Sequence, residues 1–122
     1  MEKRKPTLRV VFYQESNGNE PVHKWLKALD KEMRRIIGED MKKVQYRWPL
    51  GMPLVRSLGN KLWEVRSAIP NGIARIIFIV VNNKMVLLHG LIKKTQKTPL
   101  QDINLAWARS KNYEEQEDDE EK

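Results

Sequence analysis

A nine-residue apolar run, Ile73–Val81, constrains the fold of this chain more than any other feature of the sequence. One charged residue, Arg75, interrupts it, and its β-branched residues are typical of a strand at the centre of a sheet. Turn signals bound the run on both sides, Pro70–Gly72 before it and Asn82–Asn83 after it. These signals predict consecutive hairpins, and therefore an antiparallel meander with this strand in its middle.

Periodic segments on both sides extend the meander to a complete domain. Its outer strands are predicted over residues 61–67 and 85–93, and a first strand over residues 8–13. Between this first strand and the meander, two amphipathic helices are predicted, the first beginning at Pro21 and the second capped by Asp30. The second helix ends at Pro49, and we expect an antiparallel helical hairpin. Residues 49–60, which contain two glycines and two prolines, predict a loop.

A final helix and an acidic end follow the meander. Thr98 is a suitable N-cap and Pro99 a suitable first residue for this helix. Residues 114–122 contain seven acids and one lysine, and we predict a disordered tail after a folded domain of residues 1–113. The predicted fold class is α+β: a small antiparallel sheet in the order βααβββα, with a helical hairpin and a C-terminal helix. The apolar stripe of the final helix consists of Leu100, Ile103, Ala106 and Trp107.

Charge divides the chain into a strongly basic part and an acidic end. The whole chain has a formal net charge of +7, from 23 basic and 16 acidic residues. Without residues 114–122, 22 basic and nine acidic residues remain, which gives a net charge of about +13. A small domain this basic repels itself, and a polyanionic partner such as RNA would offset that repulsion. The alternative is charge that only keeps the domain soluble.

Several kinds of site are excluded because the chain lacks the residues that they require. It has no cysteine, which removes disulfides, thiolate metal ligands and thiol nucleophiles. The two histidines, His23 and His89, are not in a metal-binding spacing, and no Gly-rich phosphate loop occurs. No apolar run is long enough to span a bilayer, and no apolar signal segment follows the charged N-terminus. We therefore expect a cytoplasmic protein with no metal, no cofactor and no membrane contact.

Charged residues at specific places in the predicted sheet are the candidates for a site. Strand alternation places Trp63 and Val65 on the core face. Glu64 and Arg66 would then lie on the open face of the sheet. Arg75 lies in the central strand, where a charge is costly unless it is solvated or paired. Three lysines gather at the end of the last strand: Lys93, Lys94 and Lys97.

This constellation is suited to RNA cleavage without a metal. In that reaction the 2′-hydroxyl attacks the adjacent phosphate, and cations stabilise the charge that develops on the phosphorane. Arg66 and Arg75 fit this role because their forked donors match phosphate oxygens. The proton acceptor stays open among His89, Glu64 and a lysine beside other positive charges. Basic residues of the second helix are candidates for RNA contact: Arg34, Arg35, Lys42 and Lys43.

Most of the chain resembles one known family. LGNKLWEVRS (58–67), ARIIFIV (74–80) and LLHGLIKKTQKTPLQDINLAWAR (87–109) are similar to the phage-derived, HigB-type branch of the RelE toxins. That branch has a LWELR strand, an arginine opening the next strand, and a KKTQKTP segment before a final helix. FYQESNGNEPVHKWL (12–26) also resembles its opening, so the likeness covers residues 8–113. KKTQKTP is the most specific of these motifs.

The resemblance implies both a fold and an activity. The fold is the small sheet with helices described above, and the activity is cleavage of messenger RNA in the ribosomal A site, without a metal and leaving a cyclic phosphate. Arg66 resembles the basic residue of the family's LWELR strand. Arg75 resembles the arginine that holds the scissile phosphate. Lys93, Lys94 and Lys97 match the family's basic segment, which contacts RNA or aids the leaving group.

The resemblance leaves the catalytic base open and implies a protein partner. Leu62 and Glu64 stand where some RelE members have lysines, one of which is the general base, and the catalytic tyrosine of other members has no clear match here. The base therefore stays open. The resemblance also implies an antitoxin encoded beside the toxin, commonly a helix-turn-helix protein of the HigA type, which blocks the positive face.

Two other functions remain as alternatives to an RNA-cleaving enzyme. One is a non-catalytic module that binds RNA or the ribosome, which requires only diffuse charge. The other is a phage-derived structural protein with an incidental basic face. In these cases Arg66 and Arg75 would be ion-pair partners and His89 a core histidine. The enzyme instead requires the two arginines and a base to meet within a few ångströms.

Overall fold

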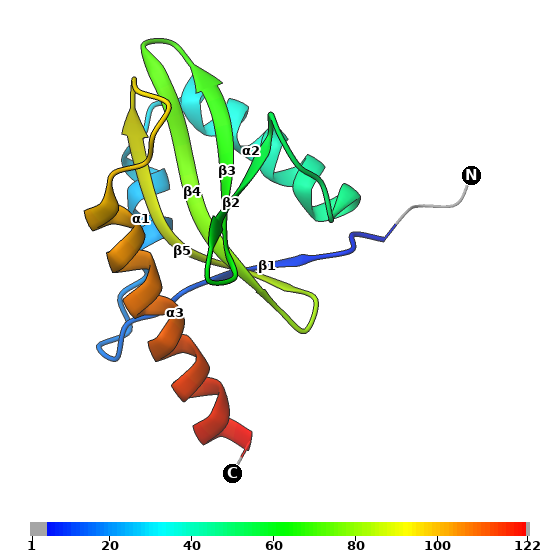
Figure 1. The fold of residues 1–122 in the computed structure, drawn as a ribbon, viewed down its shortest axis with the longest axis vertical. Coiled ribbons are helices and arrows are strands. Elements are labelled where there is room, and N and C mark those ends of the chain that lie inside the picture. The colour runs from blue at the N-terminus through cyan, green and yellow to red at the C-terminus, as the bar shows by residue number, and fades with distance from the viewer. Residues whose placement is uncertain (1–4, 122) are drawn as a thin grey trace.

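The structure, a computed structural model, describes residues 5–121 as a five-stranded mixed sheet with three helices (Figure 1). The predicted α+β class is confirmed, and the architecture is compatible with the fold that the resemblance implies. Residues 1–4 and residue 122, the outermost parts of the predicted domain and tail, lie outside the described residues. The elements are, in chain order, β1 (Arg9–Phe12), α1 (Pro21–Ala28), α2 (Lys31–Arg47), β2 (Val55–Gly59), β3 (Leu62–Ile69), β4 (Gly72–Val81), β5 (Lys84–Lys93) and α3 (Leu100–Glu121).

The sheet has the strand order β1-β5-β4-β3-β2, with the predicted meander of β3, β4 and β5 at its centre. The prediction of a wholly antiparallel sheet was wrong at one edge, where β1 pairs with β5 in parallel. Parallel neighbours require a long crossover connection. Here the whole path through both hairpin helices and the meander separates the two strands, so local turn signals could not reveal their pairing.

Strand β2 lies within the stretch that we predicted as a loop. It pairs antiparallel with β3 through a two-residue turn, in which Asn60 and Lys61 have φ angles of 52° and 66°. Positive φ at both positions is typical of the tight turns that match the twist of a hairpin. Glycine usually occupies the second position, and the lysine found here concealed the turn in the sequence.

Helices α1 and α2 form in the predicted places, and each packs on the sheet, α1 on β5 and α2 on β3. Asp30 caps α2, because its carboxylate accepts a hydrogen bond from the Met33 amide at 2.9 Å, and Trp48 ends the helix directly before Pro49. Helices α1 and α2 cover one face of the sheet (Figure 1). Between this face and the helices lies a first core, whose buried residues include Val22, Ile37, Val44, Ile76, Phe78 and Leu87.

Helix α3 covers the other face of the sheet, over β4 and β5, where it encloses a second core. Ile103, Ala106 and Tyr113 face this core, whereas Leu100 and Trp107 are 69% and 36% exposed. The predicted stripe was therefore wrong at these two positions. Trp107 lies toward solvent, with the Lys111 ammonium 4.3 Å from its ring.

The acidic end differs from the disordered tail that we predicted, because residues 114–121 continue α3 (Figure 1). Tyr113 is buried directly before them, and Lys84 lies 3.5 Å from the Glu117 carboxylate. The Gln116 side chain also donates to the Gln14 carbonyl at 3.2 Å. Glutamate and glutamine are good helix formers, so these anchors are enough to extend a helix that composition alone does not predict.

None of the helices within residues 5–121 has the length and the apolar character needed to cross a membrane.

Two glycine substitutions test the packing of the helical hairpin on the sheet. A Cβ atom at Gly90 would lie 2.4 Å from the Trp25 ring, whereas a Cβ at Gly38 in α2 would meet no atom within 4 Å. We expect Gly90→Ala to lower the free energy of unfolding by about 1–3 kcal/mol through overpacking. Gly38→Ala, the control, should raise it by up to about 1 kcal/mol. Urea denaturation measures both, and equal effects would contradict this packing.

Candidate functional site

Two arginines face each other across the centre of the sheet. Arg66 on β3 and Arg75 on β4 are direct cross-strand partners, so their side chains leave the same face, the one that carries α3. Like charges in directly opposite positions destabilise a sheet. The surroundings of these two side chains must therefore compensate for the repulsion.

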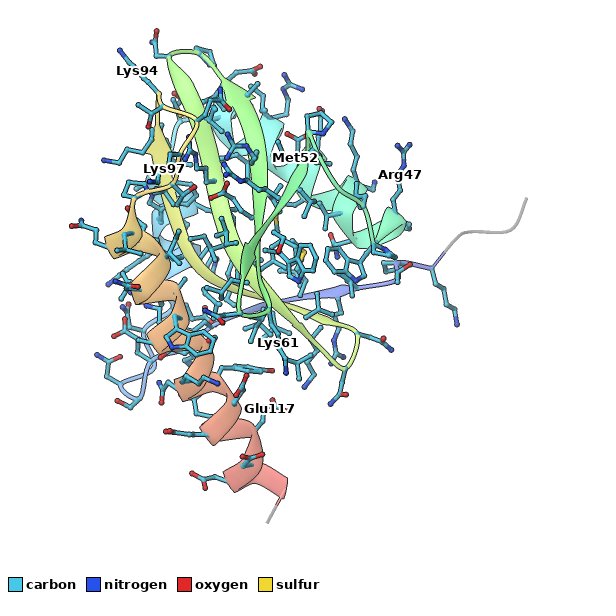
Figure 2. All side chains as sticks on the ribbon, viewed as in Figure 1. Arg47, Met52, Lys61, Lys94, Lys97 and Glu117 are labelled. Atoms are coloured by element: carbon cyan, nitrogen blue, oxygen red, sulfur yellow. The ribbon has the colours of Figure 1, made fainter. Side chains whose placement is uncertain are left out.

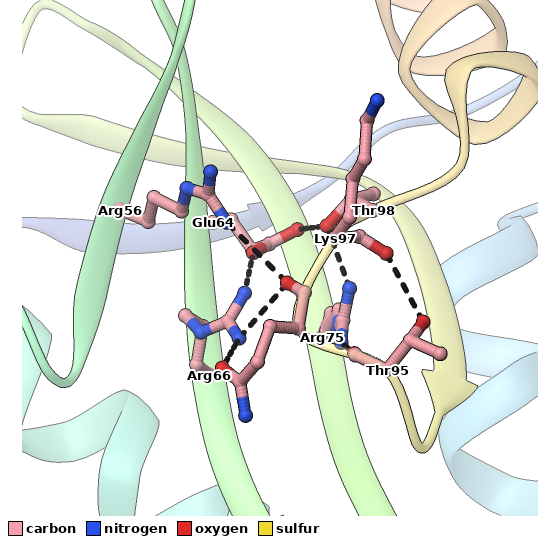
Figure 3. A network of polar contacts seen from close by, with 8 residues as sticks. Arg56, Glu64, Arg66, Arg75, Thr95, Lys97 and Thr98 are labelled. Carbon is pink, nitrogen blue, oxygen red and sulfur yellow. Dashed lines mark hydrogen bonds and ion pairs between the residues drawn. The ribbon is translucent and has the colours of Figure 1, made fainter.

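A network of polar contacts supplies that compensation (Figure 3). Glu64 accepts a hydrogen bond from Arg66 Nη1 at 2.6 Å through one carboxylate oxygen. Its other oxygen accepts from the Thr98 hydroxyl, which in turn accepts from Arg75 Nη1 at 2.9 Å. Glu64 and Thr98 thereby join the two guanidinium groups. We call Glu64, Arg66, Arg75 and Thr98 the arginine cluster.

The arginine cluster also holds the chain between β5 and α3, residues 94–99, which we call the connecting segment. Arg75 Nη2 donates to the Thr95 carbonyl. Arg66 Nη2 donates to the Gln96 carbonyl at 3.2 Å and to the Gln96 side-chain oxygen at 2.8 Å. The Thr98 hydroxyl bonds Glu64 and Arg75, so it joins the connecting segment to the sheet. We had predicted Thr98 as the N-cap of the final helix instead.

Burial of the cluster corrects our prediction that Glu64 and Arg66 lie on an open face. Helix α3 and the connecting segment cover that face, so Glu64 and Arg75 are 0% exposed and Arg66 is 8% exposed. Burial lowers the pKa of Arg75, because a charge removed from water is destabilised; Glu64 and Asp102 oppose this change, while Arg66 and Arg56 add to it. Two guanidinium groups thus share one carboxylate, and the site is electropositive.

A cavity of about 450 Å³ opens beside Arg66. Its walls come from α2, from the loop before β2, from β3 and β4, and from the connecting segment. Three of its polar residues are Arg66, Lys43 and Gln96, and Asp40 is the one carboxylate among the described residues that line it. The rest of the lining is apolar: Met52, Pro53, Leu54, Ala68 and Ile73.

The predicted basic residues of the strand end and of α2 have different surroundings. Lys93, Lys94 and Lys97 are exposed, and Lys97 points away from the arginine cluster (Figures 2 and 3). On α2, Lys43 lines the cavity with Arg66. Lys42 lies in a neighbouring surface hollow, which shares Lys43 with the cavity.

The two arginines that we had predicted on α2 for RNA contact do not line the cavity. Arg34 lines a separate hollow against β1. Arg35 is engaged by two carboxylates, with Nη1 2.8 Å from Glu39 and Nη2 2.5 Å from Glu32, and these raise its pKa. The structure thus brings only Lys43, of the four basic residues predicted on this helix, to the cavity.

His89 lies away from the cavity, on the part of β5 that α3 covers. Its Nε2 atom is 2.6 Å from the Asp102 carboxylate, and its Nδ1 atom is 3.5 Å from the Arg109 guanidinium. Arg109 also donates to the Leu88 carbonyl at 2.8 Å. The group ties the first turns of α3 to β5, and it does not border the cavity lining.

Sequence reasoning missed three of the residues that build this site. Gln96 and Thr98 belong to the KKTQKTP segment, in which we had assigned site roles only to the lysines and had predicted Thr98 as a helix cap. Asp40 carried no signal, since an acid among basic residues on a helix is usually a solvated ion pair. Within residues 5–121, no group of three or more His, Cys, Asp or Glu side chains gathers as a metal site would require.

The model of one protein family, described as phage-derived protein Gp49-like, matches residues 24–111 of this chain. The match includes Asp40, Lys43, the whole arginine cluster and the connecting segment. No curated protein matches the chain in sequence.

Thr98→Val tests whether the arginine cluster holds the connecting segment. The valine retains the shape but loses the hydroxyl that bonds Glu64 and Arg75, and leaving such buried groups unpaired costs about 1–3 kcal/mol of unfolding free energy. Thr95→Val is the matched control: its side chain is exposed and donates only a long hydrogen bond to the Lys97 carbonyl, at 3.4 Å, and Arg75 bonds its backbone carbonyl. The control should change stability by less than about 0.5 kcal/mol. Equal denaturation midpoints for the two variants would contradict the structural role of Thr98.

Proposed function

We propose a function from the premise that this chain belongs to the phage-derived Gp49-like family, a RelE/toxin-like family. In this proposal, the chain is the toxin of a toxin–antitoxin pair and belongs to the HigB-type branch. Its activity is that of an endoribonuclease that cleaves messenger RNA in the cytoplasm, at the ribosome and without a metal. This activity goes beyond family membership, and the arginine cluster supplies the physical argument for it.

The observation that carries the proposal is the position of Arg66 between a positive interior and a cavity. One side of its guanidinium is fixed by Glu64, and the other reaches the cavity wall, where it bonds the side-chain oxygen of Gln96. A phosphate oxygen is a stronger, charged acceptor for the same donor. A scissile phosphate that displaces the Gln96 amide would neutralise a charge that the protein alone leaves uncompensated.

The roles of the residues follow from their burial. Arg66 stabilises the phosphorane, because a preorganised donor in a site of low polarity acts strongly on developing charge. Arg75 and Glu64 are 0% exposed, and we assign them to positioning Arg66 and the connecting segment rather than to contact with RNA. Lys93, Lys94 and Lys97, all exposed, bind flanking phosphates.

Binding of RNA or the ribosome without cleavage is the second candidate. It is favoured by one observation: of the acid–base groups that we had named, Glu64 is fully buried and His89 is engaged by α3. Both candidates share the same basic surface, and both allow an antitoxin of the helix-turn-helix, HigA-like type to block it. An assay of cleavage distinguishes the two.

Arg66→Lys tests the proposed phosphate contact. Lysine keeps the positive charge beside Glu64 but lacks the planar fork that bonds Glu64 and a phosphate together. We expect cleavage of messenger RNA by the purified protein, with ribosomes present, to fall about a hundredfold. Arg9→Lys, on the edge strand β1, should cleave at the wild-type rate. If Arg66→Lys remains folded by circular dichroism and fully active, Arg66 does not bind the scissile phosphate.

Salt dependence tests the lysines of the connecting segment. Each phosphate that a protein neutralises on single-stranded RNA contributes about −0.7 to the slope of log affinity against log salt. Lys94→Gln with Lys97→Gln should therefore make the slope shallower by about 1.4. Lys61→Gln with Arg9→Gln removes the same charge elsewhere, and Lys61 lies well away from Lys94 and Lys97 (Figure 2). Identical slopes for the two double variants would show that only total charge matters.

A further inference from the structure

We propose that Asp40 is the proton acceptor of the cleavage reaction, a role that rests on the proposed function of the Arg66 cavity. Attack by a 2′-hydroxyl on its neighbouring phosphate requires a group that takes the hydroxyl proton, within hydrogen-bond reach of the same site. That group must therefore border the cavity into which Arg66 projects.

The contacts and positions of the other candidates argue against each of them as the proton acceptor. Glu64 is 0% exposed, and its two oxygens are occupied by Arg66 and Thr98. His89 is not part of the cavity lining, because it lies against Asp102 and Arg109 of α3. The lysines of the connecting segment are not in the lining either, and Lys43, which is, has its ammonium paired with Asp40 at 3.7 Å.

Asp40 meets the requirement from a different element, the middle of α2. Its side chain is 18% exposed and borders the same cavity as Arg66, Lys43 and Gln96. The Lys43 ammonium lies 3.7 Å from one Asp40 oxygen, one helical turn further along α2. This single long contact leaves the carboxylate able to accept a proton, in contrast to the two short contacts that occupy Glu64.

The cations around Asp40 explain how a carboxylate is tolerated where RNA must bind. Lys43 and Arg66 border the same cavity, so the local charge remains positive when Asp40 is ionised. A nucleotide seated with its phosphate on Arg66 and its ribose toward α2 would place the 2′-hydroxyl between the two elements. Met52, Pro53 and Leu54 form an apolar wall of the same cavity.

The proposed reaction requires only the Asp40 carboxylate, the RNA and water as proton donors and acceptors. The Asp40 carboxylate takes the 2′-hydroxyl proton, and the 2′-oxygen forms a bond to phosphorus. The bond between phosphorus and the 5′-oxygen breaks, which leaves a 2′,3′-cyclic phosphate. The departing 5′-oxygen takes a proton from water, and Asp40 later returns its proton to solvent. No oxidant, reductant or metal is consumed.

Asp40→Asn in the full chain tests the assignment, with Glu39→Gln as the matched control. Glu39 is the preceding residue, pairs with Arg35 and does not line the cavity, so the control removes the same charge from the same helix. We measure single-turnover cleavage of messenger RNA on ribosomes, and separately the affinity for the same RNA with 2′-deoxyribose at the cleaved position. Asp40→Asn should lose at least about a hundredfold in rate, with unchanged or slightly tighter binding. Glu39→Gln should match the wild type in both.

Three results would overturn the assignment in distinguishable ways. Cleavage by Asp40→Asn at the wild-type rate would exclude Asp40 as the acceptor and leave the proposed endoribonuclease intact. Loss of cleavage together with loss of binding to the deoxy RNA would assign Asp40 to shaping the cavity. Absence of cleavage by the wild-type chain, with binding retained, would remove the proposed function and this role with it.

Discussion

The apposition of Arg66 and Arg75 across β3 and β4 is the constraint on which the rest of the site depends. Two positive side chains leave one face of a sheet at directly paired positions, and that face is covered. Without partners, such a pair would be among the most costly arrangements in a protein interior. The chain resolves it with one carboxylate, one hydroxyl and the carbonyl groups of the connecting segment.

This solution couples the fold to the site. The hydrogen bonds that compensate the arginines also hold residues 95–98 against the sheet, and therefore fix where α3 begins. The compensation is incomplete, because two guanidinium groups share Glu64, and Arg56 adds a third positive charge near them. An anion at the cavity would complete it. In the proposed function, the same network that stabilises the fold also holds Arg66 at the cavity for a phosphate.

The sequence was sufficient for the elements whose signals are local. The meander follows from its turns, α2 from its Asp30 cap and Pro49 stop, and the need of Arg75 for polar partners from its apolar surroundings. Pairing between distant segments was not predictable in this way, so the parallel β1–β5 edge was missed. The extension of α3 was missed because it depends on tertiary anchors such as Tyr113, which composition does not reveal.

The site was predicted in part for the same reason. Strand alternation placed Glu64 and Arg66 on one face correctly, since the period of a strand is local. Strand alternation could not show that α3 and the connecting segment cover this face. The exposed fraction distinguishes Arg66, which is partly accessible, from Glu64 and Arg75, which are fully buried. Asp40 reaches the cavity from another layer of the fold, so only the packing of α2 on the sheet brings it there.

The most direct test of the central claim is a map of RNA ends in cells. The intact chain would be induced in a bacterium that lacks the cognate antitoxin, and the 5′ ends of messenger RNA compared before and shortly after induction. An endoribonuclease acting through Arg66 and a 2′-hydroxyl predicts new internal ends that carry a 5′-hydroxyl, located within translated regions. Growth arrest with an unchanged map of 5′ ends would contradict cleavage and leave binding alone as the activity of this surface.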